Sequence, residues 1–343
     1  MAAASPARVC DECGAELAPS LLTCPSCRRL VHGARLSALA REAEAAVQRG
    51  DLSGGVAHWR SALELLPVES AQHAQVHERI AALSARIERE GGVSPAAASS
   101  RTLGGPLAAV GALGLLLWKF KALALLALGK AKLLLLGLTK ASTLLSMLAS
   151  LGVYWAAWGW KFAAGLVASI YVHEIGHVAA LRRYGIPASA PMFVPGLGAF
   201  IRSSQYPATP REDARVGLAG PLWGLIAVGA CYAGHLATGW QSLAAIARVG
   251  AWLNLFNLLP IATLDGGRGF SSFAREQRWL AVAVLAGLWA ATEEGLLLLL
   301  VLGGAGRALV GRPAAAADWP AFALYAGLAA VLSLATLIPV VTR

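Results

Sequence analysis

The stretch "YVHEIGHVAALRRYG", residues 171–185, places two histidines and a glutamate inside one of the most hydrophobic parts of the chain. Ionisable side chains are costly within a bilayer and generally mark a functional site there. The 343 residues are 57% hydrophobic and only 14% charged, whereas soluble proteins carry about 25% charged residues. Apolar runs dominate from Thr102 onward. The sequence therefore predicts a membrane protein that performs chemistry at this segment.

Composition divides the chain into a soluble head and a membrane part. We expect an all-α polytopic membrane protein with a small soluble N-terminal domain. The predicted organisation is a four-cysteine knuckle over 1–32, a helical domain over 33–90, a linker over 91–102, apolar and Lys-rich membrane segments over 103–140, a membrane core with the HEIGH segment over 141–270, and C-terminal transmembrane segments over 271–343.

The net charge of +10 is concentrated next to apolar segments. This placement fits membrane topology and contact with the lipid bilayer better than nucleic-acid binding, so we expect no nucleic-acid partner. The first residues lack the apolar stretch of a secretory signal. Arginines that flank the apolar segments then face the cytoplasm: Arg182, Arg183, Arg202, Arg211, Arg215, Arg268, Arg275 and Arg278. We expect a multi-pass protein of the plasma (cell) membrane with a cytoplasmic head.

Four of the five cysteines form two CxxC pairs, Cys10 with Cys13 and Cys24 with Cys27. In a reducing compartment such pairs hold metal more often than they form disulfides. Four thiolates complete a tetrahedral zinc shell, which can fold a segment too small for its own core. The sequence predicts a zinc-ribbon-like knuckle with a structural zinc; a redox dithiol or inert cysteines are the alternatives.

Residues 34–90 predict three helices, with a break at "RGD", 49–51, and a second break at Pro67. The stretch "AEAAVQRGDLSGGVAHWRSALELLP" resembles one tetratricopeptide-type helical hairpin. Such a unit would bind a cytoplasmic protein partner through residues 1–90, whereas a plain helical spacer fits the pattern equally well.

Residues 119–140 carry lysines on about half of a helical wheel. This pattern suits a helix that lies in the membrane interface with its lysines toward lipid phosphates. A transmembrane helix with snorkelling lysines is the competing interpretation.

The HEIGH segment has the spacing of a metal site. On a helix His173 and His177 project from one face, one turn apart, so that both imidazoles can bind one ion. Glu174 can then reach a metal-bound water as general base without being a ligand. A structural metal or a buried polar knot is the alternative interpretation.

Catalytic zinc takes three protein ligands and keeps one open position, so a third ligand is expected elsewhere. The stretch "NLFNLLPIATLDGGRG", 254–269, offers Asp265 at the cytoplasmic end of its segment. Pro260 weakens the helix, and Gly266 with Gly267 is expected to end it. Broken backbone at membrane depth is tolerated only where it is buried in protein or lines a wet cavity. An aspartate in an ordinary turn is the alternative interpretation.

The two segments together resemble the site-2 protease family of intramembrane zinc metalloproteases. HExxH and N-x-x-P-x-x-x-x-D-G appear here as HEIGH and as Asn257, Pro260, Asp265 and Gly266. "GLAGPLWG", 217–224, is similar to the family's small-residue segment, and "PMFVPGLGAFI", 191–201, to its hairpin. The resemblance covers roughly residues 140–270.

The resemblance implies a catalytic zinc bound by His173, His177 and Asp265, with Glu174 as base. It also implies that Asn257 holds the substrate or polarises its carbonyl. The expected function is then a zinc metalloendopeptidase that cuts in or near a transmembrane helix of a membrane-bound, regulatory protein.

Two other functions compete with this one. A membrane scaffold or sensor would recruit a partner through its head and carry an inactive site, against which the intact set of four residues argues. A zinc transporter would need polar ligands repeated along a path through the membrane, whereas the sequence shows one cluster.

Overall fold

The protein is described from a computed structural model, which covers residues 8–91, 141–203, 205–261 and 263–340. The chain forms two compact units. Unit 1 contains the head with Leu181–Pro187 and Ser203–Glu212, and unit 2 contains the rest of the membrane part. Most of the predicted linker and the Lys-rich segment 119–140 lie outside the described residues.

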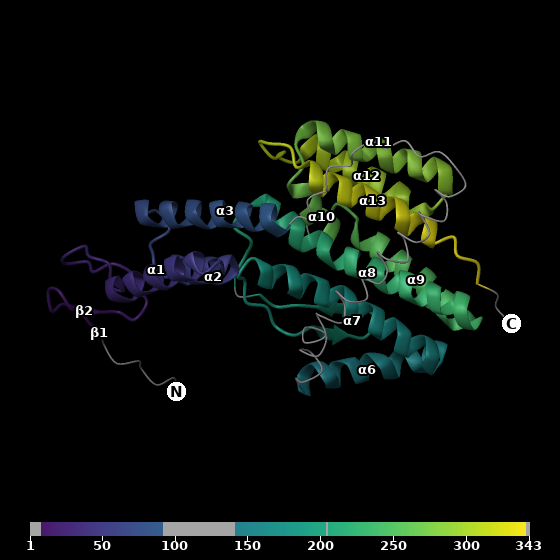
Figure 1. Cartoon of the computed structure of the whole chain (residues 1–343), viewed down its shortest axis with the longest axis horizontal. Coiled ribbons are helices and arrows are strands. Elements are labelled where there is room, and N and C mark those ends of the chain that lie inside the picture. The colour runs from purple at the N-terminus through teal and green to yellow at the C-terminus, as the bar shows by residue number, and fades with distance from the viewer. Residues whose placement is uncertain (1–7, 92–140, 204, 262, 341–343) are drawn as a thin grey trace. The chain divides into compact units, whose positions relative to one another are not determined.

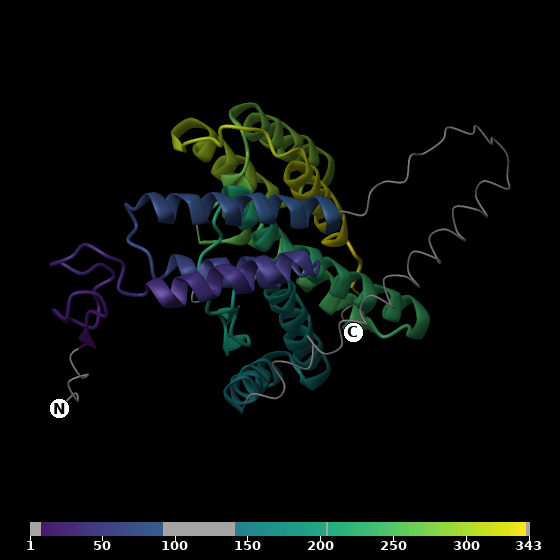
Figure 2. The same ribbon diagram turned by 60° about the vertical axis from the view of Figure 1, so that its left-hand side comes forward.

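Unit 1 begins with a short antiparallel pair, β1 (Arg8–Val9) with β2 (Glu16–Leu17). Three helices follow: α1 (Gly33–Gln48), α2 (Leu52–Leu63) and α3 (Ala71–Gly91). They lie side by side in the purple and blue part of Figures 1 and 2, and they bury apolar residues such as Val56, Trp59 and Ile80. Asp51 caps α2 by accepting a hydrogen bond from Gly54 N. The three predicted helices and the break at 49–51 are confirmed.

Unit 2 begins with α6 (Ala141–Trp158), which Gly159 separates from α7 (Trp160–Arg183). Gly159 has a φ of +81°, a left-handed conformation that suits glycine. The predicted hairpin is present as β3 (Met192–Val194) and β4 (Gly198–Phe200), with Phe193 paired to Ala199. Phe193 is buried in one apolar cluster with residues of α6 and α7.

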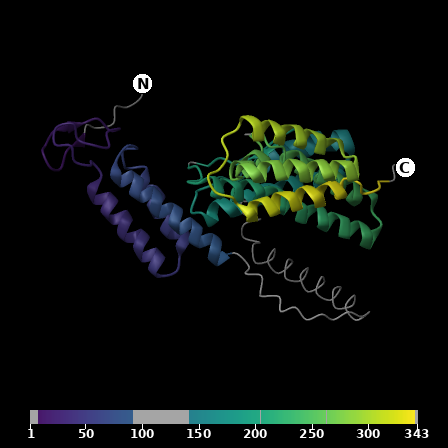
Figure 3. The same ribbon diagram turned by 90° about the horizontal axis from the view of Figure 1, so that it is seen from above.

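The remaining helices of unit 2 share a second apolar core. They are α8 (Pro210–Thr238), α9 (Gln241–Asn257), α10 (Asp265–Ser271), α11 (Arg275–Thr292), α12 (Gly295–Val310) and α13 (Trp319–Ala335). Figure 3 shows the green to yellow C-terminal helices running alongside one another. The protein is therefore mainly helical, as predicted.

Three helices of the described part are long and apolar enough to cross a membrane: α6, α7 and α8. Helices α12 and α13 are apolar but shorter. These helices support the predicted membrane fold, because a helix of about 20 residues spans the hydrocarbon.

One detail of the prediction is wrong. Gly266 and Gly267 do not end a helix; they lie inside α10, which starts at Asp265. The preceding helix α9 already ends at Asn257, before Pro260, because proline lacks the N–H that a helix needs. Gly266 permits a close approach, since an added Cβ would overlap the carbonyl group of Leu258.

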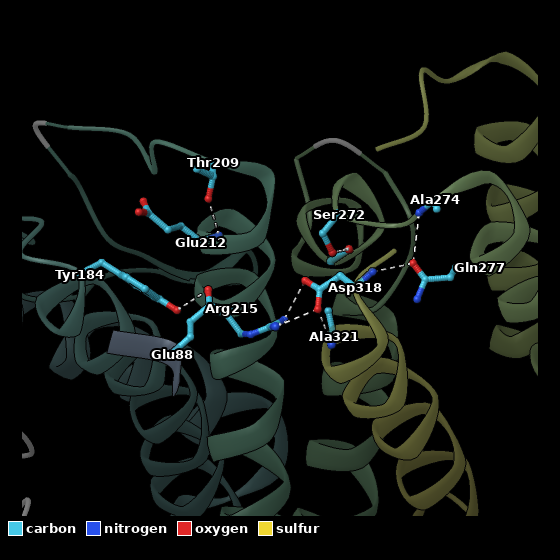
Figure 4. Close-up of polar contacts among 11 residues, drawn as sticks. Glu88, Tyr184, Thr209, Glu212, Arg215, Ser272, Ala274, Gln277, Asp318 and Ala321 are labelled. Atoms are coloured by element: carbon cyan, nitrogen blue, oxygen red, sulfur yellow. Dashed lines mark hydrogen bonds and ion pairs between the residues drawn. The ribbon is translucent and has the colours of Figure 1, made fainter. Parts of the chain in front are cut away.

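A largely buried polar network joins α8 to the starts of α11 and α13 (Figure 4). Arg215 of α8 donates two hydrogen bonds to the Asp318 carboxylate, at 3.1 and 2.8 Å. Asp318 also caps α13 through Ala321 N, and its own N–H donates to Gln277 Oε1 at the start of α11. The fully buried Gln277 thus links the starts of α11 and α13. The Arg215–Asp318 pair connects α8 to the same network.

Candidate metal and catalytic site

Helix α7 presents three buried polar side chains in its apolar middle. His173, Glu174 and His177 are 5%, 7% and 7% exposed. The two histidines lie one turn apart, as the spacing predicts, and their Nε2 atoms are 3.2 Å apart. Both imidazoles therefore direct a nitrogen to the same point.

Asp265, the first residue of α10, completes a triangle with the two histidines. Its Oδ2 lies 3.1 Å from His173 Nε2, and its Oδ1 lies 3.2 Å from His177 Nε2. With zinc–ligand bonds of about 2.0–2.1 Å, two ligands of a tetrahedral zinc stand about 3.3 Å apart. The two imidazole nitrogens and the Asp265 carboxylate are therefore spaced as three corners of a zinc tetrahedron would be, which leaves the fourth corner to another group.

The other nitrogen of each imidazole has its own hydrogen bond. His173 Nδ1 lies 2.8 Å from Asn254 Oδ1, and His177 Nδ1 lies 2.8 Å from the backbone carbonyl of Val216. Both acceptors favour Nδ1–H tautomers, which leave the Nε2 lone pairs for a metal. Asn254 is not among the residues predicted from the sequence, although an asparagine one turn before Asn257 in an apolar helix is a visible signal.

Two glycines of α8 make room for this arrangement. An added Cβ at Gly220 would overlap the Nε2 atoms of His173 and His177, and one at Gly224 would overlap the Asn254 amide. The small-residue segment 217–224 therefore lets the α8 backbone approach His173, His177 and Asn254 closely. Such a space is what a metal ion and its ligands require.

Asn257 lies at the end of α9, with its Nδ2 3.4 Å from His173 Nε2. The structure thus brings the amide next to the triangle of His173, His177 and Asp265. An amide at this position can donate a hydrogen bond to an oxygen atom beside the site.

The four head cysteines form a second cluster, in which Sγ atoms of Cys10 and Cys27 lie 3.8 Å apart and those of Cys13 and Cys24 3.6 Å apart. Thiolates on one tetrahedral zinc stand about 3.8 Å apart, given zinc–sulfur bonds of about 2.3 Å. Backbone N–H groups of Cys27 and Ser26 lower the pKa of the Cys24 thiol to about 6. The cluster fits a zinc ribbon.

Comparison with known proteins agrees with this geometry. Residues 161–241 match the family model described as "Peptidase family M50". The match covers the segment that contains HEIGH and the hairpin 191–201. M50 is the site-2 protease family, so the predicted resemblance is confirmed for the part of the chain that holds the HEIGH segment.

The chain also resembles "Putative zinc metalloprotease Rip3" from two strains of Mycobacterium tuberculosis. Each pair is 31% identical over 176 residues, which cover 47% of this chain and 44% of the relative. The chain thus matches less than half the length of these curated relatives. No solved structure matches it.

The amide of Asn254 is expected to control zinc affinity. Asn254→Leu removes the acceptor for His173 Nδ1–H and should weaken zinc binding at the membrane site about 10–100-fold, as outer-shell changes do. Competition with a chelator measures the effect. Asn254→Asp keeps an acceptor oxygen and should stay close to wild type; equal losses in both variants would contradict the orienting role.

Proposed function

We propose that this protein is an intramembrane zinc metalloendopeptidase. It hydrolyses a peptide bond in or near a transmembrane segment of a membrane-bound regulatory protein. One observation carries the proposal: two imidazole nitrogens and a carboxylate form a zinc-sized triangle, and the buried Glu174 follows the first of the two histidines on the apolar helix α7. The M50 match and the named relative support the same chemistry.

His173, His177 and Asp265 would hold the ion. Bound zinc supplies Lewis acidity, which activates water and polarises a carbonyl. Glu174 accepts a proton from the attacking water and passes it to the leaving amine. The amide of Asn257 donates to the carbonyl oxygen of the substrate, where negative charge develops. A helical substrate must first unwind, because its carbonyls are engaged in i to i−4 hydrogen bonds.

The head contributes a second, structural zinc in this proposal, held by Cys10, Cys13, Cys24 and Cys27. The proposed location is the plasma membrane, with the head in the cytoplasm and the lipid bilayer around the apolar helices. The arginines that flank the apolar segments support this orientation.

A membrane scaffold that recruits partners through the head would also need a folded zinc ribbon and helices. It would not need a buried base beside three metal ligands, nor the glycines that keep α8 close to them. Buried ionisable groups are expensive in a membrane, so their complete set favours catalysis.

Glu174→Gln tests the proposal. The change keeps the side-chain shape and should retain zinc, whereas loss of the general base lowers turnover by about 10²–10⁴-fold. Membrane proteomes of strains with wild-type and variant protein are compared. A membrane protein, or its trimmed stump, should accumulate only in the variant.

Glu276→Gln is the control, because Glu276 is exposed at the start of α11. No accumulation in the Glu174→Gln strain, under conditions in which the protein is expressed and zinc-loaded, would count against proteolysis and favour the scaffold.

A further inference from the structure

Arg60 of α2 is a buried cation that holds two segments of the membrane part within unit 1. It is 5% exposed and donates through three different nitrogens. Nε bonds to Tyr184 O at 3.1 Å, Nη1 to Tyr206 O at 3.0 Å, and Nη2 to the Glu212 carboxylate at 2.7 Å. Glu212 is fully buried, so the pair is desolvated on both sides. The planar guanidinium fork donates from three separate nitrogens at once, whereas a lysine has its donors on a single nitrogen.

The same head helices hold the end of α7 at further points. Ser53 Oγ donates to Arg183 O at 2.8 Å. Gly185 has a φ of +64°, and an added Cβ would lie 2.6 Å from Ser53 O. The head backbone thus packs directly against the residues that follow α7.

Helix α3 adds side-chain contacts to the same place. Arg183 donates to Ile87 O at 2.9 Å, and Tyr184 Oη donates to Glu88 Oε1 at 3.2 Å (Figure 4). Contacts from both α2 and α3 make the end of α7 an integral part of the head.

The held segments are the last turn of α7 and the first turn of α8. Leu181 follows His177 by one turn on α7, and Val216 follows Glu212 by one turn on α8. Val216 supplies the carbonyl that accepts the His177 Nδ1–H. The head therefore holds both helices one turn away from the two groups of that hydrogen bond.

We propose that the head clamps the ends of α7 and α8, and that Arg60 is a positioning residue for His177. Since each helix is continuous, fixing its end fixes the depth of its site residue. Releasing the clamp lets α7 and α8 shift relative to each other, which weakens the His177–Val216 hydrogen bond. The head then acts on the site through the segments Leu181–Pro187 and Ser203–Glu212, which include the end of α7 and the start of α8. A test of this proposal by cleavage activity rests on the proposed function, whereas a test by zinc release from the membrane site does not need cleavage.

The test compares full-length Arg60→Ala, Arg60→Lys and Arg86→Ala. Arg86 pairs with Glu90 on the surface of α3 and is the matched control. Arg60→Ala should release the membrane-site zinc to a chelator about 10-fold faster, a typical size for the loss of outer-shell support. On the substrate identified with Glu174→Gln, kcat should fall by a similar factor, while KM stays within about twofold. Arg60→Lys should be intermediate and Arg86→Ala unchanged.

Hydrogen exchange reports whether Leu181–Pro187 opens in Arg60→Ala. Open segments with unchanged zinc release would overturn the proposal. If Arg60→Ala does not fold, Glu212→Gln tests the proposal instead. This variant removes the negative charge that faces Arg60 but keeps an oxygen that can accept from the Ala208 N–H. It should show the same faster release, and wild-type release would overturn the clamp. If the wild type cleaves no membrane protein, the proposed function fails. The rate of zinc release still tests whether the head positions His177.

Discussion

Replacing Gly220 with alanine is expected to remove zinc from the membrane site and abolish turnover. Alanine normally stabilises a helix by about 1 kcal/mol relative to glycine. Here the added methyl group would overlap the Nε2 atoms of both histidines, which have little space to move because Nδ1 of each is hydrogen-bonded. The ligand triangle must open, so the loss should exceed the roughly 10²–10⁴-fold effect of losing a general base.

Gly229→Ala is the matched control. Gly229 lies in the same helix, and an added Cβ there would meet no atom of the described residues within 4 Å. This variant should keep both zinc ions and full turnover. Metal analysis per chain and a cleavage assay measure both variants. A zinc-replete, active Gly220→Ala would show that the α8 backbone does not limit the space at the site.

The sequence was informative where one element carries a complete pattern. HEIGH predicts that His173 and His177 lie close together, because a helix brings residues i and i+4 to one face. Asp265 lies 88 positions after His177, so its pairing with HEIGH depended on the expected depth of its segment and on the family resemblance. The four-cysteine cluster and the three head helices were predicted for the same reason, because each has a local signature.

Contacts between distant segments have no such signature. The Val216 carbonyl that orients His177 is backbone, which no residue type reveals. Gly220 is part of the small-residue segment noted in the sequence. The space that it leaves beside His173 and His177, however, depends on how closely α8 approaches α7. Arg60 meets Glu212 across 152 positions, and nothing near either residue predicts this pair. The predicted domains follow the order of the sequence, whereas the compact unit around the head also contains two segments of the membrane part, Leu181–Pro187 and Ser203–Glu212.

Asp265→Ala is expected to lower bound zinc from two ions per chain to one and to eliminate cleavage. Asp265 offers a separate oxygen to each histidine, so its loss leaves two imidazoles and no anionic ligand. Catalytic zinc sites use three protein ligands, and two do not hold the ion under chelation. The remaining ion should be the one in the head, where the four cysteines are untouched.

Two controls separate this loss from general unfolding. Asp213 pairs with Arg268 of α10 at 2.8 Å without joining the ligand triangle, so Asp213→Ala should keep two zinc ions. Cys24→Ser should lose the head zinc and keep the membrane one. Because the two sites lie in different compact units, the losses should add in the double variant. An Asp265→Ala protein with two zinc ions would assign the third ligand to another residue and leave the Asp265 carboxylate as a hydrogen-bond partner of the histidines.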